Sequence, residues 1–351
     1  MPDVRDRARI AVIGAGWWAC QVYIPALLAR GDAELVAVNR RDREGLDTVM
    51  AEFGVPAGYV DHREMLERER PDGVLVVSPH TLHHGHASDA LRAGAHVLVD
   101  KPMTTDAADA RALVALAEER GLHIVVPYGW NFKDFTSRAA ALVRDGRIGE
   151  PRHVMCQMAS PTRDLFGGEG LMETADHLFR PERSTWADPE RAGGYGWGQL
   201  SHALGLLFAV TGLEPREVTA ITGASPAGVD YYDAALVRFA DGATAALSGA
   251  ATVPKQSGYQ LDLRVFGTEG MLLLDVERER MELRRDDGDD VVLDVPAGAG
   301  EYACVEPVGR LVDLCLGRPV LNESPGLVGQ RAVEVLDAMY RSAASGRTER
   351  V

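Results

Sequence analysis

A glycine-rich turn behind a short apolar run is the first feature of this sequence that could do chemistry. The segment 14–19 (GAGWWA) follows directly after the apolar run 10–13. The first glycine permits a tight turn, the second lets a phosphate approach the backbone, and a small third residue lets helix and strand lie close together. The helix that follows offers N–H groups and the positive end of its dipole. This pattern predicts a dinucleotide pyrophosphate loop, with Gly14, Gly16, Trp17 and Trp18 against the cofactor.

The residues after the second predicted strand, which ends at Val38, indicate which cofactor the loop binds. Folds selective for NAD place an acid here for the ribose hydroxyls, whereas an arginine accommodates the 2′-phosphate of NADP. This chain has Asn39, Arg40 and Arg41 in that place, and its nearest acid, Asp42, comes later. We therefore expect NADP, with NAD possible. The alternative is that both arginines only face solvent where a helix begins.

Polar residues also follow two further predicted strands. The segment 78–83 (SPHTLH) follows one, and 100–102 (DKP) follows the next, which covers 97–99. Ligands of an open α/β sheet bind outside the carboxyl ends of its strands, so both segments should face the crevice of the glycine turn. We expect the following residues beside the cofactor: Ser78, His80, His83, Asp100 and Lys101. The neighbouring histidines have no carboxylate or cysteine partners, and we predict no metal site.

The elements that must position these residues alternate from residue 9 to about 126. Short runs rich in β-branched residues, typical of buried parallel strands, cover 10–13, 35–38, 74–77, 97–99 and 124–126, with helical stretches between them. This alternation predicts a doubly wound parallel sheet, a Rossmann fold, over 1–126. After Pro127, successive hairpin patterns predict a second α+β domain, 127–351, with a large, mostly antiparallel sheet. A helix at about 326–345 should dock back on the protein.

Composition narrows the class of protein. The chain has 351 residues, which favours two domains, and its 25% charged and 46% hydrophobic residues are ordinary for a globular protein. A formal charge of −15 argues against nucleic acid or an anionic membrane as a partner. Four separated cysteines, no apolar run of membrane-spanning length and no secretory pattern predict a cytoplasmic protein with reduced thiols.

Together, the glycine turn, the Asp-Lys-Pro tripeptide and the segment 193–202 (GGYGWGQLSH) resemble the Gfo/Idh/MocA oxidoreductases. That family carries Glu-Lys-Pro where this chain has Asp-Lys-Pro, and a glycine-rich segment that ends in an active-site histidine. The resemblance extends over nearly the whole chain. It implies an NAD(P)-dependent enzyme that interconverts a secondary alcohol and a ketone on a sugar, inositol or similar small molecule.

The resemblance also implies roles for single residues. Lys101 would lie beside the reacting oxygen and stabilise a developing alkoxide, and His202 would act as general acid and base. Tyr128, Trp130 and Asn131 match the segment that lines the family's substrate site, although Phe132 and Lys133 replace the arginines often found there. Relatives assemble through the sheet of the second domain, so we expect a homodimer or homotetramer.

One departure concerns the substrate. Many relatives have an aspartate four residues before the histidine, but this chain has Gly198 there, followed by Gln199. Either the neutral amide of Gln199 contacts a substrate hydroxyl or that contact is lost, so the common inositol or glucose preference does not transfer. The stretch 164–191, with Glu173, Asp176, His177, Arg180 and Arg183, is either a substrate lid or a solvated loop.

Two other functions fit the same resemblance. One is a catalytically silent regulator that binds a nucleotide, and the other is a glycosidase-like or eliminating enzyme that recycles its nicotinamide. The presence of both Lys101 and His202 favours the oxidoreductase over the regulator.

Overall fold

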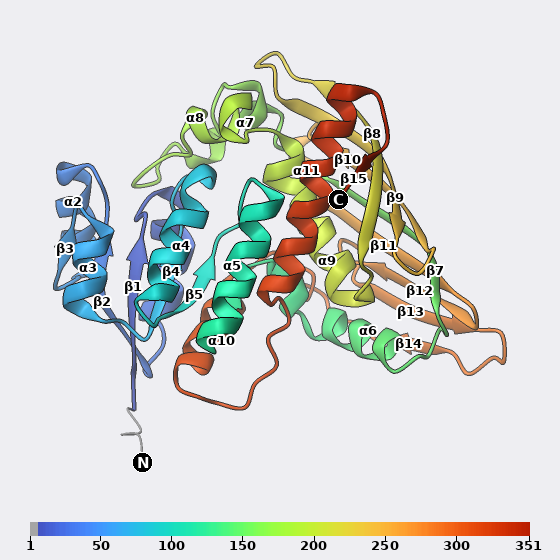
Figure 1. Ribbon diagram of the computed structural model, residues 1–351, viewed down its shortest axis with the longest axis horizontal. Helices are drawn as coiled ribbons and strands as arrows, with labels where there is room; N and C mark the ends of the chain where they lie inside the picture. Colours follow the sequence, from blue (N-terminus) through green and yellow to red (C-terminus); the bar gives the residue numbers. More distant parts are fainter. Residues whose placement is uncertain (1–5) are drawn as a thin grey trace. The chain divides into compact units, whose positions relative to one another are not determined.

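The structure, a computed structural model, describes residues 6–351 and divides into two compact units (Figure 1). The first unit holds the described chain up to Gly129 together with two later segments, Leu171–Pro181 and Ala303–Gln330. The second unit holds Trp130–Gly170, Glu182–Tyr302 and Arg331–Val351.

A six-stranded parallel sheet forms the centre of the first unit, in the order β3-β2-β1-β4-β5-β6. Its strands are β1 (Ala8–Ile13), β2 (Ala33–Asn39), β3 (Gly58–Tyr59), β4 (Gly73–Val76), β5 (His96–Val99) and β6 (Ile124–Val125). The apolar runs of β1, β4 and β5 are buried, as strands covered on both faces should be. This strand order confirms the predicted doubly wound fold, whose switch point lies between β1 and β4.

Helices cover this sheet. They are α1 (Ile24–Leu28), α2 (Arg43–Phe53), α3 (His62–Glu69), α4 (His83–Arg92), α5 (Ala107–Arg120) and α10 (Val305–Cys315). Helix α4 contacts β4 and β5 (Figure 1). Helix α10 contacts β5 and α1. Arg30 and Arg318 each pair with Asp32 and with Asp313, which ties α10 to the turn between α1 and β2. A segment from late in the chain thus completes the first unit.

A nine-stranded sheet forms the second unit, in the order β14-β13-β12-β11-β7-β10-β9-β8-β15. Its strands are β7 (Pro151–Ala159), β8 (Pro215–Ala224), β9 (Asp230–Phe239), β10 (Thr244–Ala250), β11 (Gln260–Gly267), β12 (Gly270–Asp275), β13 (Arg280–Arg285), β14 (Val291–Leu293) and β15 (Glu349–Arg350). Strands β7 and β10 pair in parallel and the other neighbours are antiparallel, which confirms the predicted mostly antiparallel sheet. Buried and exposed residues alternate along β9, so one face of the sheet is covered.

The helices of the second unit are α6 (Asp134–Arg144), α7 (Arg163–Gly167), α8 (Arg183–Trp186) and α9 (Ser201–Thr211), and α11 (Gly326–Ser345) continues into it from the first unit. Helix α9 contacts α6, β7 and β11. Almost all of its residues are buried, as its apolar sequence requires.

A π-helical turn, Gly196–Leu200, leads into α9, and buried polar contacts fix its start. The carboxylate of Asp230 accepts hydrogen bonds from the Gly196 backbone N–H at 2.7 Å and from the Tyr340 hydroxyl at 2.7 Å. The rings of Trp197 and Tyr340 stack with their centroids 5.3 Å apart. These contacts fix the start of α9 and therefore the position of His202, its second residue.

Candidate active site

The ends of four neighbouring strands meet in one row at the carboxyl edge of the first sheet. Asn39 of β2 pairs with Ile13 of β1, Ile13 pairs with Val76 of β4, and Val76 pairs with Val99 of β5. The predicted cofactor segments start within two residues of this row. Strands in a sheet lie about 4.8 Å apart, so the strand pairing itself brings these segments together.

The glycine turn has the close backbone approach that a dinucleotide loop requires. Gly14 has a φ of +86°, and a Cβ there would lie 2.6 Å from the backbone N and Cα of Ser78. The backbone N–H groups of Gly14 and Ala15 donate to the Asn39 carbonyl oxygen at 3.1 and 3.0 Å. A Cβ at Gly16, in contrast, would meet no atom nearer than 3.9 Å. A glycine at position 14 is therefore required for the close packing of the turn against Ser78. Gly16 leaves space for phosphates on the outer side of the turn, so the turn fits a dinucleotide.

The residues after β2 have different surroundings. The side-chain amide of Asn39 donates to the carbonyl oxygens of Tyr59 and Val60, both at 3.0 Å. The Arg40 guanidinium donates to Asp42 at 2.8 Å and to the Ala15 carbonyl oxygen at 3.0 Å, so it lies against the glycine turn. The hydrogen bond from Arg40, together with one from the Gly45 backbone N–H, holds the pKa of the Asp42 carboxyl below the usual value. Arg41 is exposed.

The histidines after β4 connect two strand ends. The buried His83 ring has Nδ1 2.7 Å from the Pro102 carbonyl oxygen and Nε2 2.7 Å from the Ser78 carbonyl oxygen. Burial lowers the pKa of this ring. His80 is also buried, with its ring edge-on to His83, and His86 Nδ1 lies 2.9 Å from the Ser78 hydroxyl. Across residues 6–351, no group of three or more metal-ligating side chains is placed to hold a metal ion.

Asp100 holds Lys101 at the end of β5. One oxygen of the Asp100 carboxylate accepts from the Lys101 backbone N–H and from the Tyr23 hydroxyl, both at 2.9 Å. The Lys101 side chain is 7% exposed, and burial lowers the pKa of its ammonium. Tyr128 is buried as well, which raises the pKa of its phenol. A buried lysine that releases its proton more readily than an exposed one is suited to proton transfer.

In the second unit, His202 lies among aromatic rings. The His202 side chain is 3% exposed, and its ring meets those of Trp130 and Tyr302 edge-on, with centroids 5.3 Å away in each case. Trp130 also contacts Tyr302 and Tyr259, with centroids 4.5 and 4.7 Å apart. The Trp130 indole N–H donates to the Gly300 carbonyl oxygen at 3.0 Å. This enclosure fixes the plane of the imidazole.

The other predicted substrate residues lie near the same helix. The Asn131 amide donates to the Gly205 carbonyl oxygen of α9 at 3.2 Å, and Gln199 is partly exposed in the π-helical turn. A Cβ at Gly198 would lie 2.6 Å from the Phe166 ring and 3.2 Å from the Trp186 ring. The space that an aspartate side chain would need is therefore filled by aromatic carbon.

The structure thus gathers the predicted residues into two sets. The first unit holds the predicted cofactor residues, Lys101 and Tyr128, and the second unit holds Trp130, Asn131, Gln199 and His202. Tyr23, Tyr259 and Tyr302 were not predicted as site residues. Tyr259 and Tyr302 lie in loops, where an isolated aromatic residue is the signal that points to a site.

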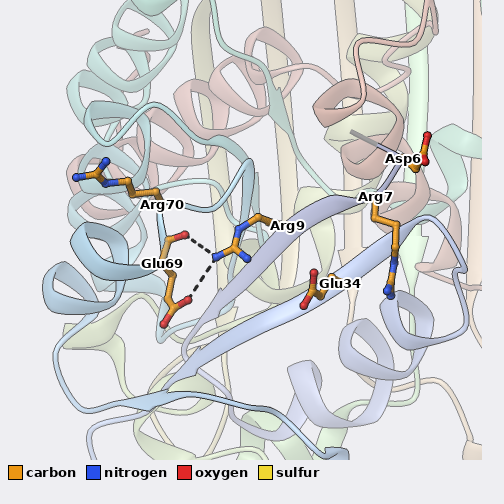
Figure 2. A pocket seen from close by; sticks show the side chains of 6 residues that line it. All are labelled: Asp6, Arg7, Arg9, Glu34, Glu69 and Arg70. Atoms are coloured by element: carbon orange, nitrogen blue, oxygen red, sulfur yellow. Dashed lines mark hydrogen bonds and ion pairs between the residues drawn. The ribbon is translucent and has the colours of Figure 1, made fainter. Parts of the chain in front are cut away.

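A hollow lined by charged residues lies at the opposite end of β1 (Figure 2). Its lining residues are Asp6, Arg7, Arg9, Glu34, Glu69 and Arg70. Arg9, the second residue of β1, donates to both the backbone and the side chain of Glu69 there. Because this hollow is at the amino end of the strands, it is separate from the dinucleotide edge.

Comparisons with known proteins agree with this arrangement. The oxidoreductase family with the NAD-binding Rossmann fold, GFO/IDH/MocA, matches residues 8–128, and the GFO/IDH/MocA C-terminal domain matches residues 136–273. In the described residues, no helix is long and apolar enough to cross a membrane.

Individual relatives extend the comparison. A dTDP-3,4-didehydro-2,6-dideoxy-alpha-D-glucose 3-reductase from Streptomyces antibioticus is 31% identical, covering 84% of this chain and 85% of its own. A D-xylose 1-dehydrogenase (NADP(+)) from Haloferax volcanii is 26% identical over 74% of each chain.

Solved structures show the same fold. GenD2 from gentamicin A biosynthesis, solved in complex with NAD, is 26% identical with a TM-score of 0.77, covering 99% of this chain and 97% of its own. The chain is therefore an oxidoreductase of the Gfo/Idh/MocA family.

Proposed function

We propose that this enzyme interconverts a secondary alcohol and a ketone on a sugar or sugar-like substrate, with NADP(H) as its preferred cofactor. The observation that carries the proposal is the buried Lys101 at the sheet edge that also presents the glycine turn. The names of the relatives support the substrate class, since one is a reductase of a dTDP-linked deoxysugar and another is a xylose dehydrogenase.

Lys101 and His202 move the proton in this proposal. The bound nicotinamide supplies or accepts the hydride. During reduction, the Lys101 ammonium stabilises negative charge on the carbonyl oxygen, and His202 donates a proton. During oxidation, His202 accepts the hydroxyl proton and the Lys101 ammonium again stabilises the alkoxide. The buried position of Lys101 supports this role, because a charge that is shielded from water acts more strongly on the reacting oxygen.

The cofactor preference depends on Arg40. Its guanidinium lies against the glycine turn, where the ribose next to the pyrophosphate binds in dinucleotide folds, and Arg41 is exposed beside it. Asp42, the nearest acid, already caps α2 through the Gly45 backbone N–H at 3.1 Å and pairs with Arg40. These contacts favour a 2′-phosphate over a free ribose hydroxyl.

The aromatic surroundings of Gly198 bear on the substrate. Phe166 and Trp186 occupy the volume that an aspartate at this position would fill. The substrate therefore meets the neutral amide of Gln199 in this region rather than a carboxylate.

We propose a small sugar-like molecule as the ligand and a homodimer or homotetramer as the assembly.

A substrate screen tests the proposal. Purified enzyme is assayed by NADPH absorbance against ketosugars and, in the opposite direction, against pyranoses and inositols with NADP and NAD. We expect turnover with at least one sugar-like substrate and a lower Kd for NADP than for NAD. Binding of either dinucleotide without turnover on any substrate would instead support a regulator.

A further inference from the structure

The segment Leu171–Pro181 belongs to the first unit, although the chain on both sides of it belongs to the second. It is ordered by its own hydrogen bonds. The Thr174 hydroxyl donates to the Leu171 carbonyl oxygen at 2.6 Å, and the Arg180 guanidinium donates to the Ala175 carbonyl oxygen at 2.9 Å. The segment therefore has a defined shape that can present particular side chains.

One of these side chains contacts the residue that follows the glycine turn. The Trp17 indole N–H donates to Nδ1 of His177 at 2.9 Å. The two rings are nearly parallel, with an angle of 20° and centroids 6.5 Å apart. Trp17 also meets Trp18 edge-on, at 5.3 Å between centroids. His177 thus holds the segment at the end of the turn where the phosphate-binding helix begins.

A second side chain contacts the other side of the turn. The Arg40 guanidinium lies over the Phe179 ring, with Cζ 4.0 Å from the ring centroid. The same guanidinium donates to Ala15 and to Asp42. His177 and Phe179 are two residues apart, and one contacts Trp17 while the other contacts Arg40. The segment consequently spans the turn from Trp17 to Arg40.

We propose that Leu171–Pro181 is a wall of the dinucleotide site, in which His177 slows release of the cofactor and Phe179 orients Arg40 for the 2′-phosphate. This inference rests on the proposed function, because it requires a dinucleotide on the glycine turn. A ligand held between Trp17 and Arg40 leaves only after the segment opens. A guanidinium stacked on a ring loses less freedom when it binds a phosphate.

The two contacts predict different effects on the rate of cofactor release. His177→Ala removes a contact near the phosphates that NAD and NADP share, so NADPH and NADH should both dissociate about fivefold faster. Phe179→Ala frees Arg40, so NADPH should dissociate about threefold to fivefold faster while NADH is little changed.

Conservative variants provide matched controls. His177→Gln keeps an acceptor for the Trp17 indole N–H, and Phe179→Tyr keeps the ring under Arg40, so both should release cofactor at nearly the original rate. Leu178→Ala, between the two contacts and 37% exposed, should behave like the unmodified enzyme. Melting temperatures of all variants show whether any change in rate reflects unfolding.

Stopped-flow displacement of NADPH or NADH, followed by nucleotide fluorescence, measures these rates without turnover. Dissociation rates that are the same in all variants would overturn the inference while leaving the proposed function intact. The inference would also be overturned if His177→Ala bound the dinucleotide faster and with a lower Kd, because the segment would then obstruct the site. Failure of the unmodified enzyme to bind either dinucleotide would contradict both proposals.

Discussion

Lys101 is the residue on which the proposed chemistry depends most directly. Lys101→Ala should lower kcat by about a hundredfold or more and change the Kd of the dinucleotide little, because a group that stabilises alkoxide acts mainly in the transition state. His202→Ala should lower kcat similarly and alter the pH profile near neutrality.

Steady-state kinetics and equilibrium titration of these variants measure both quantities. If the two residues handle the same proton, the double variant should lose much less than the product of the single losses. Unchanged kcat in both single variants, with the physiological substrate, would show that the assigned residues are wrong.

Arg40 determines the cofactor preference in this account. Arg40→Asp removes a phosphate contact, repels the 2′-phosphate and offers the NAD ribose an acceptor, so the preference should reverse. A charge-assisted contact contributes about 1.5–3 kcal/mol, which corresponds to at least a tenfold preference for NADP in the unmodified enzyme. Titration of both dinucleotides checks this, and equal affinity of the unmodified enzyme for both would contradict it.

The surroundings of some residues could be predicted from the sequence, and those of others could not. The positions of Gly14, Ser78 and Asp100 followed from strand ends, because parallel pairing aligns those ends at one edge. The filled space beside Gly198 did not follow, since Phe166 is more than thirty residues away in sequence and only tertiary folding brings them together. The contact between His177 and Trp17, 160 positions apart, was equally inaccessible.

Elements were predictable where burial imposes a clear pattern. The β-branched runs of the first sheet agree with the structure because strands covered on both faces are apolar throughout. Helix α11 agrees because its apolar residues recur at helical spacing. The missed elements include the polar α3 and β13, the short β14, and α10, an amphipathic helix of 11 residues. The π-helical turn before α9 has no distinct signal in the sequence, because the Asp230 and Tyr340 contacts that fix its start come from distant elements.

His96, the first residue of β5, makes the stability of the first sheet depend on pH. His96 Nδ1 accepts a hydrogen bond from the His123 backbone N–H at 3.0 Å, and the two rings stack at 5.2 Å. Burial, followed by the nearby His123, lowers the pKa of His96 to about 4, while Asp72 opposes the shift. The folded state therefore favours the neutral ring.

We expect the free energy of unfolding to fall as pH is lowered from the ordinary histidine value of 6.5 to about 4, because only the unfolded chain takes up this proton. In His96→Gln, the number of protons taken up on unfolding between pH 6.5 and about 4 should be lower by up to about one. Urea unfolding across this pH range measures how steeply the free energy of unfolding depends on pH in each protein. The same pH dependence in the variant would count against this explanation.

At the scale of the whole molecule, the exposed face of the second sheet carries large apolar side chains. The most exposed of them are Ile221 at 76%, Leu236 at 63%, Val292 at 57%, Met155 at 47% and Tyr232 at 47%. Strand pairing places Leu236 and Met155 on either side of Ala246 in a single row across β9, β10 and β7. An apolar face of this kind is typical of an interface between subunits.

We therefore predict that a second copy of the chain covers this face. Light scattering at micromolar concentration should give the mass of a dimer or tetramer, and Leu236→Lys should shift it toward the monomer, because a buried lysine charge opposes association. A monomeric unmodified protein would contradict the prediction.

Transfer of a labelled hydride shows whether the enzyme reduces a ketosugar with NADPH. The enzyme is incubated with ketosugars and NADPH that carries deuterium at either position of C4, and the product alcohol is analysed by mass spectrometry. We expect one deuterium on the carbinol carbon from one of the two labelled forms, one NADPH consumed per product, and a rate about a hundredfold lower for Lys101→Ala. Product that forms without deuterium and without net consumption of NADPH, or bound NADPH that transfers no label to any substrate, would contradict this expectation.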